Sequence, residues 1–472
     1  MKRSVLFSKD KPCKGKVKAP SSKSALQRII ALSWLAQGET KIVNPVLCND
    51  VKAAIGIVKA LGAQVTENLS AIYIDSRGGV EKLNKPGGAI KLFCGESGLA
   101  LRMFAPIVSL NNCCFELEAA GTLNKRPALV VETLSLFGVK AADNGGFPPV
   151  SVCGLSGQLS GGFADIDCSL SSQVLSGLLL ALPAAKGNSE IKVNNLKSKP
   201  YIDLTIDLIE KFGCEIINRD YNWFGINGGQ KYKSPEIIEA EGDWSSASFL
   251  LVAAALSRGS VEVENLNIDS KQGDKAIIEV LSACGFKIEA AGKNTIFLSR
   301  DNSRSLLSPF EFDASDCPDL FPPLVALASG CCGVSLIHGV ERLRHKETDR
   351  ELALIEEFTK GGIDIKSDGK TISVFGGNGV VGRNGIFDRN DRNDRSGRDG
   401  GSGRNGVSCR NDRKGIQSFK GNSHNDHRIA MALAVAAAAG GIKVEIENAE
   451  AVEKSYPNFF NDLMNIGGQI DE

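Results

Sequence analysis

The sequence repeats one pattern of segments six times, and this repetition restricts the possible folds more than any other feature. Each copy contains an Ala- and Leu-rich segment, a turn with Gly or Asn, and a strand-like segment, and successive copies begin about 75 residues apart. The first copy reads SKSALQRIIALSWLAQGETKIVN and the sixth reads NDHRIAMALAVAAAAGGIKVEIEN. Because this period holds several secondary-structure elements, each copy is expected to be a subdomain and not one turn of a solenoid.

A second helix-like segment in each copy ends at a glycine that precedes another strand-like segment. Each unit is therefore expected to read strand, helix, strand, helix and one or two further strands, which predicts an α/β fold with helices packed under sheets. The Ala- and Leu-rich helices are expected to be buried all round. The last interval is longer because of residues 383–414, whose Asn, Asp, Arg and Gly content predicts a disordered insertion.

Composition and charge exclude several classes of function. Lys plus Arg and Asp plus Glu both total 55, so the balanced charge argues against nucleic acid as a partner. The chain has no apolar run of about 18 residues and no signal peptide, which predicts a cytoplasmic protein without a membrane span. Its thirteen cysteines, including the adjacent pairs at 113–114 and 331–332, are expected to be reduced and buried. No metal-ligand spacing or nucleotide-binding motif occurs, so no metal and no cofactor are expected.

Cations occur near the expected starts of the repeat helices. Lys23, Arg28, Arg102 and Arg428 lie there in three different repeats. The helix dipole disfavours cations at this end, whereas it favours a bound anion. Exposure to solvent is the simpler explanation for each cation alone, and capping explains most of the neighbouring serines. If the six helix starts converge, however, they form one cavity that attracts anions.

Other segments add charged groups to this candidate cavity. Arg126 precedes a helix that Pro127 is expected to begin, and Lys454 also lies ahead of a helix. Glu347 and Arg350 are three positions apart, so they are neighbours at a helix start, although ordinary ion pairing on a solvated helix would also explain them. Carboxylates among excess cations suggest proton transfer on substrates with several negative charges. A transfer reaction between anionic small molecules fits this set of residues.

These motifs resemble the 5-enolpyruvylshikimate-3-phosphate (EPSP) synthase family. The resemblance runs nearly end to end and rests on SKSALQR, SSQ, SKPYID, EGDWSSAS, KETDR, NDHR and KSYPNF in this order. It implies two globular domains, each of three βαβαββ units in an inside-out α/β barrel, with the active site in the interdomain cleft. The expected domains are 19–240 and 241–472, with 1–18 crossing over to the second. The alternatives are the sister transferase acting on UDP-N-acetylglucosamine and a non-catalytic anion-binding relative, against which Asp319 and Glu347 argue.

The resemblance also implies the reaction and its residues. The enolpyruvyl group of phosphoenolpyruvate passes to the 5-hydroxyl of shikimate 3-phosphate, and phosphate leaves, by addition and elimination through a tetrahedral adduct. The implied catalytic residues are Lys23, Asp319 and Glu347. The implied shikimate 3-phosphate contacts are Lys23, Ser24, Arg28, Ser171, Ser172, Gln173, Ser198, Tyr201, Asp319 and Lys346. The implied phosphoenolpyruvate contacts are Lys23, Gly98, Arg126, Gln173, Arg350, Arg428 and Lys454. A monomer without metal, cofactor or nucleic acid is expected.

The second motif departs from the family pattern. The sequence GESGLALRM has Glu96, Leu99 and Met103 where the family commonly has Asn, Thr and Pro. A carboxylate near a polyanion site is unfavourable unless a cation such as Arg102 pairs with it. The larger Leu99 and the missing proline are expected to shift the turn that carries Gly98. We therefore expect weaker inhibition by glyphosate, the herbicide that occupies the phosphoenolpyruvate site in this family.

Overall fold

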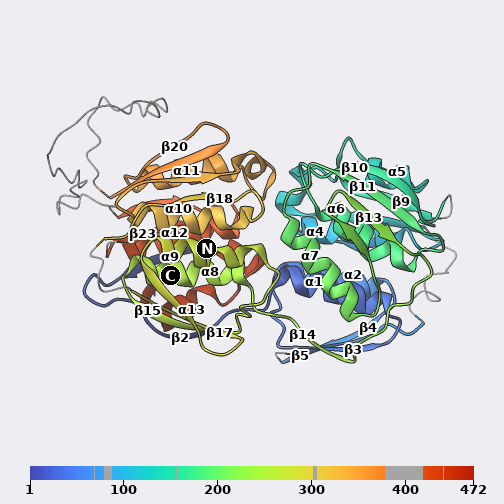
Figure 1. The fold of residues 1–472 in the computed structure, drawn as a ribbon, viewed down its shortest axis with the longest axis horizontal. Helices are drawn as coiled ribbons and strands as arrows, with labels where there is room; N and C mark the ends of the chain where they lie inside the picture. Colours follow the sequence, from blue (N-terminus) through green and yellow to red (C-terminus); the bar gives the residue numbers. More distant parts are fainter. Residues whose placement is uncertain are drawn as a thin grey trace, which may run out of the picture.

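The computed structural model describes residues 1–68, 70–78, 88–154, 157–300, 306–377, 418–439 and 441–471. The insertion expected at 383–414 lies outside the described residues. The chain forms two lobes side by side, with both termini in the same lobe (Figure 1). Each lobe has its own apolar core. One core contains residues between Ala25 and Ala240, and the other combines Val5–Ala19 with residues from Trp244 to Ile466.

Three units are continuous in sequence and share one sheet topology. In the second unit, β6 pairs in parallel with β7, and β9 lies antiparallel between β7 and β8. This unit contains β6 (Ile90–Phe93), α4 (Gly98–Val108), β7 (Cys114–Glu118), α5 (Val131–Leu136), β8 (Lys140–Asn144) and β9 (Phe147–Cys153). The third contains β10 (Gly162–Asp167), α6 (Gln173–Ala181), β11 (Ser189–Asn194), α7 (Lys199–Lys211), β12 (Ile217–Arg219) and β13 (Trp223–Ile226). The fifth contains β18 (Glu311–Asp313), α10 (Phe321–Gly330), β19 (Gly333–His338), α11 (Arg350–Lys360), β20 (Asp364–Ser367) and β21 (Thr371–Gly376).

The other three units reach the same topology with a strand from elsewhere in the chain. The first has α1 (Lys23–Leu35), β3 (Glu39–Val43), α2 (Asn49–Ala60), β4 (Gln64–Glu67), β5 (Ala71–Asp75) and the late strand β14 (Ile237–Glu239). The fourth has the early strand β2 (Lys14–Lys18), α8 (Trp244–Leu256), β15 (Ser260–Glu264), α9 (Ile277–Ala283), β16 (Phe286–Ala290) and β17 (Thr295–Arg300). The sixth has β22 (Phe419–Asn422), α12 (His427–Ala436), β23 (Lys443–Glu447), α13 (Phe459–Asn465), β24 (Gly468–Asp471) and the first strand, β1 (Lys2–Phe7). The predicted α/β fold of six repeated units is confirmed.

The chain passes between the lobes twice, and the two crossings are bonded to each other. The amide of Ser22 donates to the carbonyl of Glu241 at 2.7 Å, and the amide of Asp243 donates to the carbonyl of Pro20 at 2.8 Å. An isolated antiparallel bridge joins Ser21 to Gly242. These crossings come directly before α1 and α8, so they place both helix starts beside the connection between the lobes.

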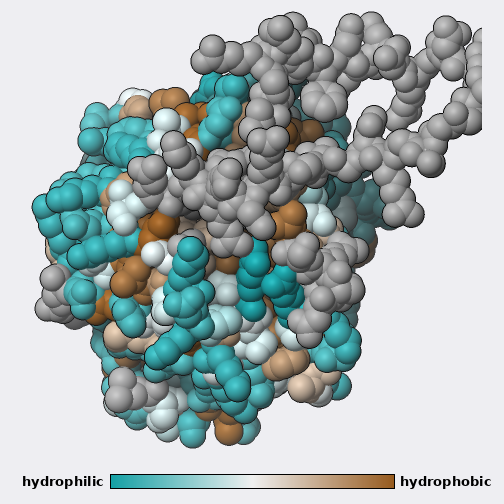
Figure 2. All heavy atoms as spheres, turned by 90° about the vertical axis from the view of Figure 1, so that its left-hand side faces the viewer, coloured by the Kyte–Doolittle hydropathy of each residue, from teal (hydrophilic) through white to brown (hydrophobic). Residues whose placement is uncertain are grey.

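The Ala- and Leu-rich helices lie inside the lobes, as predicted. Every residue of α4 and α8 is buried, because the sheets of each lobe cover helices that carry apolar side chains on all faces. The outward faces of the sheets carry polar side chains together with some exposed apolar ones, among them Phe93, Phe163 and Ile237. Seen from one end, the lobe that holds both termini is mainly hydrophilic, with small apolar groups between the polar ones (Figure 2). A buried helix can present polar groups only at its ends, so the helix starts become the candidate site.

Two local predictions are wrong. Cys114 and Cys153 form a disulfide, and Cys332 is also disulfide-bonded; the first pair forms because β7 and β9 place its two Cα atoms 4.0 Å apart. The helix expected at Pro127 begins only at Val131, since Leu129 has a φ of +65° and cannot continue a helix. No helix among the described residues is long and apolar enough to cross a membrane.

Candidate active site

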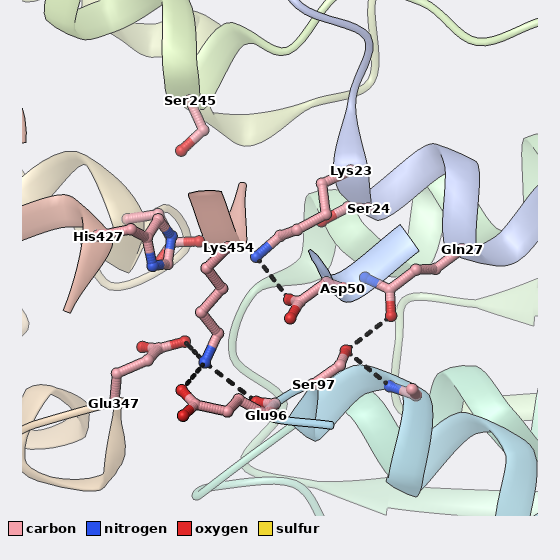
Figure 3. Close-up of polar contacts among 12 residues, drawn as sticks. Lys23, Ser24, Gln27, Asp50, Glu96, Ser97, Ser245, Glu347, His427 and Lys454 are labelled. Carbon is pink, nitrogen blue, oxygen red and sulfur yellow. Dashed lines mark hydrogen bonds and ion pairs between the residues drawn. The ribbon is translucent and has the colours of Figure 1, made fainter. Parts of the chain in front are cut away.

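Helix starts from both lobes line one cleft. Side-chain caps hold the starts of several repeat helices: the hydroxyls of Ser22 and Ser97 accept from backbone amides of α1 and α4, and the carboxylate of Asp426 caps α12. The cleft is lined by fifteen of the residues expected at the site: Lys23, Ser24, Arg28, Gly98, Arg126, Ser171, Ser172, Gln173, Ser198, Tyr201, Asp319, Lys346, Glu347, Arg350 and Arg428. Lys454 lies beside the cleft and points toward Glu347 (Figure 3).

Two buried arginines on one wall of the cleft bind neutral oxygens. Arg28 donates to the hydroxyls of Thr205 and Ser176 at 2.8 and 3.2 Å. Arg102 donates to the side-chain carbonyl of Gln173 at 2.6 Å. Burial lowers the pKa of Arg28 to about 10, and burial together with Arg126 lowers the pKa of Arg102 to about 9. Within the described parts of the chain neither guanidinium pairs with a carboxylate, so both charges remain available to an anionic ligand.

On the opposite wall, Arg350 links three carboxylates. Its guanidinium donates to Asp319 at 2.8 Å, to Glu347 at 2.7 Å and to Asp426 at 2.7 Å. Arg428 also donates to Asp319, at 2.9 Å. This arrangement fixes the carboxylates of Asp319 and Glu347 on one planar cation, since a guanidinium offers its donors in a rigid fork.

Both of these carboxylates are ionised in the cleft as it stands. Burial alone would raise the pKa of Asp319, but Arg428, Lys346 and Arg350 together hold it well below its ordinary value. Burial would likewise raise the pKa of Glu347, and Arg350 with Arg126 and Lys454 holds it well below its ordinary value. Each carboxylate can therefore accept a proton, and a bound polyanion that weakens these cations would raise its pKa.

Two lysines in the cleft have opposite pKa shifts. Burial would lower the pKa of Lys23, but Asp50, whose Oδ2 lies 3.0 Å from Nζ, raises it above its ordinary value (Figure 3). The pKa of Lys346 is lowered to about 8. Burial is the main cause and the charges of Arg342 and Arg350 act in the same direction, whereas Asp319, whose Oδ1 lies 3.8 Å from Nζ, opposes the shift. Lys346 is thus the cation of this cleft whose charge is most sensitive to mild alkali.

The two lobes are in contact across the cleft. Tyr201 of α7 donates to Asp274 of the other lobe at 2.9 Å, and its hydroxyl also lies 3.4 Å from Asp319. Arg342 of the other lobe donates to Ser198 at 2.6 Å. These bonds join the two lobes across the cleft.

Sequence reasoning missed several polar residues of the cleft. Asp50, Asp274 and His427 lie in or beside it. His427 lies inside the NDHR motif, which was a usable signal, whereas nothing in the sequence marks Asp50 or Asp274. Burial, followed by the charges of Lys23 and Arg428, lowers the pKa of His427 well below its ordinary value, so this imidazole is neutral. Burial and the charge of Asp319 raise the pKa of Asp274 to about 6.

The departures in the second motif have structural outcomes. The cation that pairs with Glu96 is Lys454 and not Arg102, which donates to Gln173. Leu99 lines the cleft and Met103 is fully buried in α4. A Cβ atom on Gly98 would lie 2.7 Å from an Arg102 nitrogen and 3.0 Å from an Arg126 nitrogen. The expected weaker inhibition by glyphosate stays a prediction.

One group of residues away from the cleft has metal-ligand character. Among the described residues, Glu356, Glu357 and His424 bring three potential ligand atoms within 4.8 Å. The ammonium of Lys360 lies 2.8 Å from both carboxylates. Because Lys360 already pairs with both carboxylates, the cluster is a structural ion-pair network at the end of α11.

Solved structures share this fold. The EPSP synthase of Acinetobacter baumannii superposes with a TM-score of 0.75 at 24% identity, covering 100% of both chains. The enolpyruvyl transferase NikO of Streptomyces tendae superposes with a TM-score of 0.71 at 15% identity, covering 100% of this chain and 98% of that one. These likenesses define the fold of the chain as that of the enolpyruvyl transferases.

Sequence comparisons give the family within this fold. The family model described as EPSP synthase (3-phosphoshikimate 1-carboxyvinyltransferase) matches residues 7–387 and 392–463. The chain therefore belongs to the EPSP synthase family. The 3-phosphoshikimate 1-carboxyvinyltransferase of Clostridium botulinum (strain Alaska E43 / Type E3) is 34% identical over 475 residues, which cover 97% of this chain and 96% of that protein. The enzyme of the same name from Clostridium perfringens (strain 13 / Type A) is 34% identical over 463 residues, with 97% of both covered. The UDP-N-acetylglucosamine alternative is not favoured.

Proposed function

We propose that the chain transfers the enolpyruvyl group of phosphoenolpyruvate to the 5-hydroxyl of shikimate 3-phosphate and releases phosphate. The observation that carries the proposal is that Arg350 holds both Asp319 and Glu347, at 2.8 and 2.7 Å, within a cleft lined by cations from both lobes. Two ionised carboxylates on one cation suit a reaction with two proton transfers, and the surrounding cations suit two anionic substrates.

In the addition step, Asp319 accepts the proton of the 5-hydroxyl while the oxygen attacks C2 of the enolpyruvyl group. Glu347, protonated once the substrate anions have weakened its cation partners, gives a proton to the methylene carbon and turns it into a methyl group. In the elimination step Glu347 takes a methyl proton back, the C2–O bond to phosphate breaks and the double bond returns. Both carboxylates must be within hydrogen-bond reach of their targets.

The cations have separate roles in this proposal. Shikimate 3-phosphate is bound by Arg28, Ser24, Ser171, Ser172, Gln173, Ser198, Tyr201 and Lys346. The phosphoenolpyruvate end is formed by Arg126, Arg350, Arg428, Lys454 and Gly98. Lys23 lies between the two substrates and stabilises the departing phosphate. Positive charge that is fixed before the reaction costs no reorganisation when charge develops on the phosphate.

The domain assignment is part of the proposal. Residues 19–240 form one domain, and 241–472 with 1–18 form the other, which is supported by the two separate cores and by the paired crossings. The domains close around the substrates, and the bonds of Tyr201 and Arg342 across the cleft belong to the closed state.

The enzyme is further proposed to act as a monomer in the cytoplasm. The site residues come from one chain, so no partner is needed to complete the cleft. Among the described residues, eight buried cysteines carry thiols, which is typical of a reducing compartment, whereas Cys114, Cys153 and Cys332 are disulfide-bonded and are exceptions to this pattern.

Phosphate release tests the function directly. Purified protein is mixed with phosphoenolpyruvate and shikimate 3-phosphate, and each substrate is then omitted in turn. Release is expected only with both substrates and should continue after chelation of metals. Release with UDP-N-acetylglucosamine in place of shikimate 3-phosphate would move the assignment to the sister enzyme, and no release with either acceptor would contradict catalysis.

A further inference from the structure

Glu96 connects the two lobes at the donor end of the cleft, which is the end proposed to bind phosphoenolpyruvate, the donor of the enolpyruvyl group. It precedes α4 in one lobe, and Lys454 ends the short 3-10 helix η8 (Ala449–Lys454) in the other. The Lys454 ammonium donates to the backbone carbonyl of Glu96 at 3.0 Å and to its side-chain Oε2 at 3.4 Å (Figure 3). The Lys454 side chain is 7% exposed, whereas the Glu96 side chain is 35% exposed, so only the ammonium group is largely withdrawn from solvent.

The Glu96 carboxylate is held in place by a second element. The hydroxyl of Thr122, in the 3-10 helix η1 (Gly121–Lys125), donates to Oε2 at 3.1 Å. A Cβ atom on Gly121 would lie 1.6 Å from Oε1, and the φ of +50° at this position also favours glycine. The glycine therefore leaves room for this carboxylate, and the surrounding structure defines its position.

Glu96 and Glu347 share one ammonium group. Oε1 of Glu347 lies 3.8 Å from the Lys454 Nζ atom, on the side of the cleft opposite to Glu96 (Figure 3). An anion that binds Lys454 must therefore compete with the Glu96 carboxylate and is repelled by it. The backbone carbonyl of Glu96 can position Lys454 whatever the side chain, so the carboxylate adds mainly negative charge.

We infer that Glu96 lowers the affinity of the donor end for anions, as a resident counter-ion of Lys454 that every phosphate-bearing ligand there has to displace. This inference rests on the proposed function. It means that the carboxylate weakens binding of phosphoenolpyruvate and of the released phosphate alike, and so favours departure of the product. Binding of shikimate 3-phosphate is not affected, because Glu96 contacts none of the residues proposed for that substrate.

The test compares Glu96→Gln with wild type. Glutamine keeps the length of the side chain and can still accept from Thr122, while it removes the charge. Because the Glu96 side chain is 35% exposed, its charge is partly screened, and we expect the dissociation constant of inorganic phosphate and the KM of phosphoenolpyruvate to fall by about two- to fivefold. The KM of shikimate 3-phosphate should stay within about twofold, and kcat should not rise.

The matched control is Glu190→Gln, which removes an exposed charge from β11 of the same lobe and should change none of these constants. Phosphate binding is measured by calorimetry on the protein alone, and Glu96→Asn serves as a second variant whose shorter side chain should shift the constants the same way. Unchanged or weaker phosphate binding in both variants, or an equal shift of both substrates, would overturn the inference. Absence of turnover in wild type would instead contradict the proposed function.

Discussion

Lys346 should give the enzyme an alkaline limit that a single substitution removes. Burial and the neighbouring arginines lower its pKa to about 8, although Asp319 opposes them. The lysine is therefore a cation below that pH and neutral above it. Since its proposed role is to bind the anion shikimate 3-phosphate, affinity should fall as pH rises through this pKa.

The size of the effect follows from a single titration. With a pKa of about 8, the fraction of free enzyme with charged Lys346 falls by about 25-fold between about pH 7.5 and about pH 9.5. The substrate does not contribute, because the second pKa of a phosphate monoester is about 6 and both substrates stay fully ionised over this range. The value of kcat/KM for shikimate 3-phosphate should fall by about the same factor, as neutral lysine binds the phosphate poorly.

The assay is the pH profile of kcat/KM for shikimate 3-phosphate at saturating phosphoenolpyruvate. Lys346→Arg keeps the cation at every pH of the series and should flatten the alkaline limb. Lys211→Arg, at an exposed ion pair of α7, is the control and should keep the wild-type profile. A flat wild-type profile, or an alkaline limb centred at about pH 8 that persists in Lys346→Arg, would refute this assignment.

Three further substitutions test the remaining parts of the cleft. Glu347→Gln should still bind both substrates in calorimetry but lose about 10²–10⁴-fold in kcat, because it can no longer exchange a proton with the methylene carbon; near-normal turnover would remove it from the mechanism. Gly98→Ala should raise the KM of phosphoenolpyruvate, since the new methyl group displaces the guanidinium groups of Arg102 and Arg126, and an unchanged KM would count against their role. Asp426→Ala leaves the buried guanidinium of Arg350 with one carboxylate fewer and removes the cap of α12. The free energy of unfolding measured in urea should therefore fall by about 3 kcal/mol. A fall of less than about 1 kcal/mol would show that the ion pair with Arg350 is dispensable.

Periodicity made the fold predictable, because each unit needs the same order of elements to bury the same kind of helix. It could not foresee the helix that begins at Val131 and not at Pro127, since the left-handed conformation of Leu129 results from the local path of the chain. The disulfide of Cys114 with Cys153 depends on the register between β7 and β9, which the sequence pattern leaves open.

The site was predictable where its parts lie close together in sequence. Glu347 and Arg350 are three positions apart, and the structure joins them at 2.7 Å. The pairing of Glu96 with Lys454 joins residues that are 358 positions apart, and it exists only because the lobes face each other. Asp50 and Asp274 were missed for the same reason: an isolated aspartate is marked as part of a site only by the fold around it.

Product analysis in D2O tests whether the enolpyruvyl group is transferred with proton exchange at its methylene carbon. The protein, phosphoenolpyruvate and shikimate 3-phosphate are allowed to react in D2O, and the product is examined by NMR. We expect an enolpyruvyl ether at the 5-position of shikimate 3-phosphate with deuterium in its methylene group, because Glu347 delivers a solvent-derived proton and later removes one from the methyl group. Failure to form this ether would contradict the proposed transfer, and an ether whose methylene carries no deuterium would contradict the proton exchange proposed for Glu347.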